Sequence, residues 1–146
     1  LVEREIAPHA ELAIWHLLVS PRLEILSLEA EALGKESWLV RLVAHNTGWL
    51  PTSVSEKAVE RRAVRPLEAE ITLPEGARLH GGEKKVELGQ LDGRVHRRSL
   101  LWWASDDATS DRAKVEWVVE APAGSVVQVE ARHQRAGVVR RELTLE

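Results

Sequence analysis

Apolar side chains recur at every second position along much of this chain, and this period constrains its fold more than any other feature. Residues 115–121 place Val115, Trp117 and Val119 on one side of an extended backbone. Residues 67–73 repeat the pattern, with Leu and Ile against Glu and Thr. Because successive side chains of a β-strand point to opposite faces, each such segment predicts a strand with one buried face.

Similar segments follow one another at short intervals, separated by Gly, Pro and Asp residues that favour turns. A slip in the alternation at Leu26 predicts a β-bulge. The expected strands are residues 22–32, 38–44, 64–73, 86–91, 99–104, 114–121, 126–132 and 138–145. About eight short strands without long intervening helices predict an all-β, antiparallel β-sandwich of the immunoglobulin or fibronectin type.

Residues 1–20 have a different pattern, because their apolar side chains lie three and four positions apart. This spacing predicts a short helix or a strap that ends at Pro21. Since the chain opens on Leu1 and contains no methionine, we interpret it as an excised fragment. We expect residues 1–20 to link and dock an upstream domain, and residues 21–146 to form the sandwich. One or two helical turns are expected over residues 54–62, with Ser55 near their start.

Composition limits the possible functions. The 146 residues fit one domain, and a net charge of −3 does not favour binding to nucleic acid. The apolar runs are too short to cross a membrane. With no cysteine, disulfides, thiolate zinc sites and thiol nucleophiles are excluded. The sequence leaves the oligomeric state and the compartment open, with a lean towards the cytoplasm.

The chain offers little for catalysis. His80 and Glu83 have the His-x-x-Glu spacing of some zinc hydrolases, but no third ligand can be identified, and both fit a solvated turn better. Asp106, Asp107 and Asp111 lack the spacing of a calcium loop. No serine elbow or phosphate loop is present. We therefore expect no catalytic, cofactor or metal site in this fragment, which by itself is not an enzyme.

Tryptophan supplies all six aromatic residues of the Phe, Trp and Tyr class. Trp38 and Trp117 lie on apolar strand faces and are expected in the core. Trp102 and Trp103 are adjacent, so they cannot both point inward from one strand. One of them is a candidate contact residue, which stacks on a sugar or packs against another domain.

Small basic clusters could bind an acidic partner or a ligand carboxylate. Neighbouring glutamates favour a surface with ion pairs instead. The clusters are Arg61, Arg62 and Arg65, then Arg97 and Arg98, and finally Arg140 and Arg141.

Residues 46–55, Asn-Thr-Gly-Trp-Leu-Pro-Thr-Ser-Val-Ser, form an uncommon string. Further characteristic segments occur at residues 20–24, 88–94, 115–119 and 131–137. In this order they resemble the C-terminal region of large bacterial zinc carboxypeptidase-like (metallocarboxypeptidase) proteins. The likeness covers most of the chain.

That resemblance implies an accessory role. In such proteins the zinc ligands and the catalytic glutamate belong to an upstream peptidase domain, and none has a counterpart here. The expected partner is therefore the upstream peptidase domain of the same polypeptide, where the zinc is also expected. The candidate contact residues are Trp15, Trp49, Leu50, Trp102 and Trp103, with burial of Trp49 inside the sandwich as an equal alternative. The alternative is a carbohydrate- or polymer-binding module that uses an exposed Trp.

Overall fold

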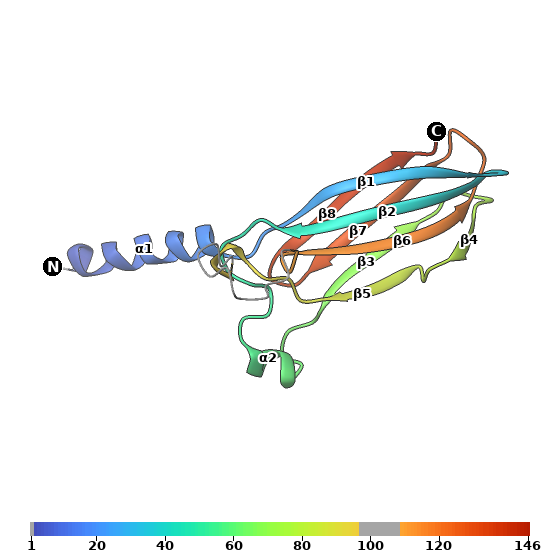
Figure 1. Cartoon of the computed structure of the whole chain (residues 1–146). Coiled ribbons are helices and arrows are strands. Elements are labelled where there is room, and N and C mark those ends of the chain that lie inside the picture. The colour runs from blue at the N-terminus through green and yellow to red at the C-terminus, as the bar shows by residue number, and fades with distance from the viewer. Residues whose placement is uncertain (1, 97–108) are drawn as a thin grey trace, which may run out of the picture.

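The structure is a computed structural model that describes residues 2–96 and 109–146. Two four-stranded antiparallel sheets pack face to face, and a helix projects from one end of them (Figure 1). The expected all-β sandwich with a short N-terminal helix is confirmed. The strand orders are β1-β2-β6-β4 in one sheet and β5-β3-β7-β8 in the other.

The elements follow the chain in this order: α1 (Val2–Val19), β1 (Leu23–Gly34), β2 (Ser37–Asn46), α2 (Glu56–Glu60), β3 (Leu67–Thr72), β4 (Arg78–Gly81), β5 (Lys85–Gly89), the 3₁₀ turn η1 (Arg94–His96), β6 (Arg112–Glu120), β7 (Val126–His133) and β8 (Gly137–Thr144).

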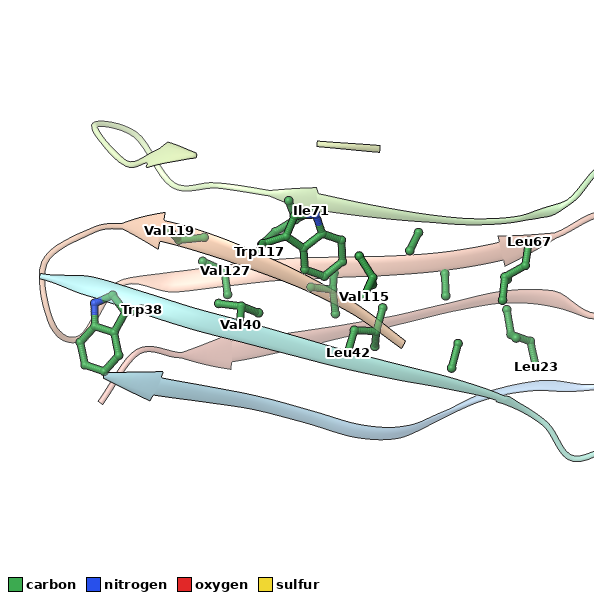
Figure 2. Close-up of a cluster of buried hydrophobic side chains, with 14 of the residues drawn as sticks. Leu23, Trp38, Val40, Leu42, Leu67, Ile71, Val115, Trp117, Val119 and Val127 are labelled. Carbon is green, nitrogen blue, oxygen red and sulfur yellow. The ribbon is translucent and has the colours of Figure 1, made fainter. Parts of the chain in front are cut away.

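The core lies between the two sheets and is built from the alternating apolar residues (Figure 2). Trp117 of β6 is fully buried at its centre, and its indole Nε1 donates a 2.8 Å hydrogen bond to the carbonyl of Glu83. Trp38 of β2 is also buried, and its Nε1 donates to the carbonyl of Ala121. Both tryptophans therefore belong to the core, as predicted, and each satisfies its polar atom there.

Strand β2 occupies the centre of its sheet, between β1 and β6. The register between β1 and β2 shifts between Ile25 and Ser27, which places an irregularity at Leu26 where the sequence predicts a bulge. The turn into β2 is formed by Lys35 and Glu36, both with positive φ, as a two-residue hairpin requires. Local sequence signals therefore locate the first hairpin correctly.

Strand β4 was not predicted. Its sequence lies in a Gly- and Pro-rich connection, and it pairs with β6 through Arg78, Leu79 and Gly81. The pairing depends on a distant strand, so no local alternation marks it. The expected strand at residues 99–104 lies outside the described residues, as do Trp102 and Trp103.

Helix α1 occupies most of residues 1–20, where the sequence predicts a short helix or a strap. It begins at Val2, ends at Val19 and continues through Pro8. Good helix formers such as Ala10, Leu12 and Ala13 follow the proline. In Figure 1 the helix points away from the sandwich, whose C-terminal residue lies at the opposite end. No helix among the described residues is long and apolar enough to cross a membrane.

Candidate functional site

Exposed apolar side chains gather at the end of the sandwich from which α1 projects. We define this helix end as α1, the loop 46–52, the α2 lobe (residues 53–65) and η1, which Figure 1 places together. Of the 14 large apolar side chains that are exposed among the described residues, ten belong to it. They are Ile6, Leu12, Ile14, Trp15, Leu17, Leu18, Trp49, Val54, Val59 and Val95.

Asn46, the last residue of β2, organises the backbone at this end. It is fully buried, and its Oδ1 accepts hydrogen bonds from the backbone N–H groups of Arg22 (2.9 Å) and Gly48 (3.0 Å). Its Nδ2 donates to the carbonyls of Leu50 (2.9 Å) and Asp92 (3.0 Å). One side chain thus joins three chain segments that are far apart in sequence, and its amide hydrogen-bonding capacity is fully used.

Thr52 adds a second link between the loop 46–52 and the segment before η1. Its hydroxyl accepts a 2.8 Å hydrogen bond from the N–H of Leu91 and donates to Oε1 of Gln90 at 2.7 Å. The N–H of Thr52 bonds the carbonyl of Leu91 in return. Since Thr52 and Leu91 are buried, these bonds form in a dry environment and fix the loop.

Two glycines allow the segments to approach this closely. A Cβ on Gly48 would lie 2.3 Å from the carbonyl oxygen of Ser20, and a Cβ on Gly93 would lie 2.3 Å from that of Trp49. Any larger residue would push the backbones apart. Gly48 and Gly93 each stand in a sequence string that carries the resemblance, and close backbone packing at this end requires both of them.

Helix α1 joins the sandwich through ordered backbone contacts. The carbonyl of Val19 accepts a 2.9 Å hydrogen bond from the N–H of Leu50, and Thr47 N–H bonds the carbonyl of Arg22 at 2.8 Å. The hydroxyl of Ser20 donates to the carbonyl of His16 at 2.7 Å. These bonds satisfy carbonyls at the C-terminal end of the helix and set the direction in which it leaves the sandwich.

A groove of about 560 Å³ lies beside this junction. Leu17, Leu18 and Trp49 form its apolar wall, and the side chains of Arg22 and Arg94 also line it. Arg22 contacts Glu24 at 3.2 Å, a distance suited to an ion pair. The groove thus combines apolar side chains with charged groups, a lining suited to contact with another macromolecule or a polymer.

The structure places three of the predicted contact residues at the helix end. Trp15 and Trp49 have exposed fractions of 55% and 52%, and Leu50 is half-buried. The alternative of a Trp49 buried inside the sandwich is therefore wrong. The predictions for Trp102 and Trp103 fall outside the described residues.

His80 and Glu83 do not face each other as a pair of metal ligands would. The His80 ring contacts the carboxylate of Glu120, and this hydrogen bond lowers the pKa of Glu120. Glu83 contributes its backbone carbonyl to Trp117, and its side chain is exposed. Within residues 2–96 and 109–146, no group of three or more metal-ligating side chains is assembled.

Two other histidines have structural partners that sequence reasoning did not assign. The Nε2 atom of His45 lies 3.0 Å from Oδ2 of Asp111, and this pair joins the end of β2 to the start of β6. His133 is buried, and its Nδ1 accepts hydrogen bonds from the N–H groups of Arg135 (3.1 Å) and Ala136 (3.3 Å). Burial lowers the pKa of His133. Both histidines thus stabilise the fold.

The sequence analysis did not identify the role of Asn46 or the solvent exposure of Val54, Val59 and Val95. Asn46 stands in the string that carries the resemblance, but its four partners can be identified only from the folded chain. Each of these valines stands singly in an irregular segment, so no hydrophobic period indicates whether it is exposed. The helix end therefore becomes visible only when the separate segments are brought together.

Comparison with known proteins identifies a family but not an activity. The chain is similar to the crystal structure of the GAE domain of GGA2p from Saccharomyces cerevisiae, with 13% identity, a TM-score of 0.45, and coverage of 87% of this chain and 92% of that one. No curated protein matches the sequence. A family model matches residues 22–144, and the chain therefore belongs to the family described as "Domain of unknown function (DUF8731)".

Proposed function

We propose that this chain is the non-catalytic C-terminal β-sandwich module of a bacterial zinc carboxypeptidase-like protein. Its helix end packs on the upstream peptidase domain of the same polypeptide, and thereby stabilises that domain or shapes access to its substrate site. Zinc and the catalytic groups belong to the peptidase domain. The observation that carries this proposal is that ten of the 14 large apolar side chains exposed among the described residues lie at one end of the molecule.

Helix α1 exposes apolar side chains on two sides. With each residue advancing about 100°, Glu5, His9 and His16 fall in one polar sector, and Arg4 and Glu11 fall in a second one. Leu12 and Trp15 lie on one side between these sectors, and Ile6, Ile14 and Leu17 lie on the other side with Glu3. Apolar side chains on a helix are typically buried against other elements. We propose that the peptidase domain provides this burial.

The sequence resemblance supports the identity of the partner, because its most unusual string forms the loop at the helix end. Residues 46–52 hold the C-terminus of α1 and expose Trp49 next to it. Such an exposed apolar patch on a small domain is typical of a surface that contacts another protein. The sequence string that carries the resemblance therefore lies at the same end of the molecule as the exposed apolar side chains.

The complete reading frame provides the first test, because an upstream peptidase domain with a His-x-x-Glu motif is expected. Hydrogen exchange then compares the complete polypeptide with the 146-residue chain. We expect amides of α1 to exchange at least about tenfold more slowly in the complete polypeptide, since docking encloses the helix. Equal exchange rates in the two proteins would contradict the docking.

A second test concerns catalysis by the module. The purified 146-residue chain is expected to fold, to bind no stoichiometric zinc and to release no C-terminal amino acid from peptide substrates. Metal analysis and a peptidase assay check these expectations. Tight zinc binding together with peptidase activity would overturn the assignment.

A glycan- or polymer-binding module is the second candidate, favoured by the half-exposed ring of Trp49 beside the groove of about 560 Å³. Aromatic faces commonly stack on sugar rings. Glycan-dependent quenching of tryptophan fluorescence that is lost in Trp49→Ala, Trp102→Ala or Trp103→Ala, and kept in Trp15→Ala, would support this candidate. No response across a glycan panel would count against it.

A further inference from the structure

Several arginines of the two sheets have carboxylate partners, whereas Arg78 on β4 and Arg141 on β8 form no ion pair with a described residue. Arg41 lies 2.7 Å from Glu116 across β2 and β6, and Arg132 lies 2.7 Å from Glu68 across β7 and β3. The hydrogen bonds from Lys85 and Arg132 hold the pKa of Glu68 below its usual range. Of the basic clusters in the sequence, Arg140 pairs with Glu130, whereas Arg61, Arg62, Arg65 and Arg141 form no ion pair with a described residue. The ion-pair surface expected for these clusters is therefore found only at Arg140, and Arg97 and Arg98 lie outside the described residues.

Exposed arginines without an ion pair are concentrated at the helix end. Arg61, Arg62, Arg65 and Arg94 are exposed, and none forms an ion pair with another residue of the described ranges. We call these four residues the arginine rim. The α2 lobe alone has four basic side chains against two acidic ones, in a chain whose net charge is −3. Positive charge is thus concentrated where the exposed apolar side chains gather.

The α2 lobe displays its apolar side chains in a defined conformation. Val54 has a φ of +67°, and the N–H of Ser55 bonds the carbonyl of Ser53 at 2.8 Å around it. A β-branched residue in the left-handed region is strained. Ser55 stabilises the lobe as the N-cap of α2, where its Oγ accepts from Ala58 N–H. The strained turn leaves Val54 exposed on the lobe, like Val59 on α2.

We propose that the surface of the peptidase domain that docks here is apolar in its centre and acidic at its margin. Its apolar part covers α1, Trp49 and Val95, and its carboxylates pair with the arginine rim. This inference rests on the proposed function and specifies the chemistry of the partner. Interfaces commonly have an apolar centre and a polar margin, and complementary charges at the margin set orientation and specificity.

Charge reversal in the complete polypeptide tests the inference. The variant Arg62→Glu/Arg94→Glu changes the rim, and Lys35→Glu/Arg78→Glu is the matched control, because Lys35 and Arg78 are also exposed and have no ion pair among the described residues. They lie in the β1–β2 turn and on β4, at the end opposite α1 (Figure 1). Hydrogen exchange of α1 and of residues 47–50 is the readout. We expect exchange about tenfold faster in the rim variant and unchanged in the control.

The salt dependence of the unmodified polypeptide gives an independent readout, which remains valid if the rim variant folds poorly. Exchange of α1 is expected to accelerate as ionic strength rises from about 0.05 M to about 0.5 M, because salt screens exposed charge pairs. Wild-type protection in the rim variant, or exchange that salt does not change, would overturn the acidic margin while leaving docking intact. Absence of protection in the unmodified polypeptide would instead remove the proposed function itself.

Discussion

Trp117 and Trp49 are the same residue type in two opposite settings. Trp117 is fully buried between the sheets and bonds Glu83, whereas Trp49 has an exposed fraction of 52% on a loop whose backbone is held by Asn46. The interior needs no partner, because its apolar side chains are buried and its indole N–H groups are hydrogen-bonded within the chain. The helix end is equally ordered in its backbone, yet leaves its apolar side chains uncovered.

The two tryptophans show that an ordered backbone and an exposed side chain have separate causes. Buried hydrogen bonds around Asn46 and Thr52 fix the loop at the helix end, and they do not bury the side chains that the loop displays. A preorganised apolar surface loses little entropy when a partner binds. This is the property expected of a docking surface.

The largest effect is expected from truncating the core tryptophan. Trp117→Ala should lower the free energy of unfolding by about 3–5 kcal/mol, because it removes a large buried side chain and leaves a cavity. Urea unfolding of the 146-residue chain measures the change. Trp15→Ala is the control and should leave the unfolding midpoint nearly unchanged. Similar losses in both variants would contradict the distinction between interior and helix end.

Asn46→Ala should lower the free energy of unfolding by about 2–3 kcal/mol, since it leaves buried backbone N–H and carbonyl groups without partners. Amides of residues 47–50 should exchange faster in this variant than in the unmodified chain, and amides of the core strands should change less. Thr47→Ala is a suitable control, because its hydroxyl makes only a 3.3 Å bond to the carbonyl of Arg22 in an exposed position. A stable variant with an unchanged loop would show that Asn46 does not organise this end.

A smaller effect is expected from acid. Burial lowers the pKa of folded His133 and the charge of Arg135 acts in the same direction, whereas the nearby Arg65 backbone acts in the opposite direction. The unfolded chain therefore takes up the proton first, near the ordinary histidine pKa of about 6.5. Stability should be full above this pH and decrease as pH falls through it towards the folded pKa. Arg132 and Glu68 line the pocket beside the ring and pair with each other.

Urea midpoints between pH 7.5 and pH 5.0 measure this effect. His133→Gln should lose part of the dependence, while the exposed His9→Gln should keep all of it. An identical pH profile in His133→Gln and the unmodified chain would assign the acid sensitivity to other groups.

The smallest effect on stability is expected at α1. Leu17→Ala/Leu18→Ala should change the free energy of unfolding of the 146-residue chain by less than about 0.5 kcal/mol, because both side chains are exposed. In the complete polypeptide the same pair should weaken docking and accelerate exchange of α1. A large destabilisation of the 146-residue chain would mean that α1 belongs to the sandwich rather than to an interface.

Several elements could be predicted from sequence because their signals are local. The bulge at Leu26, the N-cap at Ser55 and the burial of Trp117 each depend on a few neighbouring residues and on the alternation of side chains along a strand. The candidate site was predicted only in part. Trp15 and Trp49 could be singled out as bulky apolar residues, but their sequence neighbours do not reveal whether a fold covers them.

By itself, the sequence determined that the chain forms a sandwich and which side chains fill its interior, since a two-residue period fixes the direction of each side chain relative to its backbone. Only the tertiary structure decided the pairing of β4, the four partners of Asn46 and the separation of paired from unpaired arginines. These features join residues that are far apart in the chain. The spatial neighbours of such residues follow from the packing of the whole domain, which no local pattern encodes.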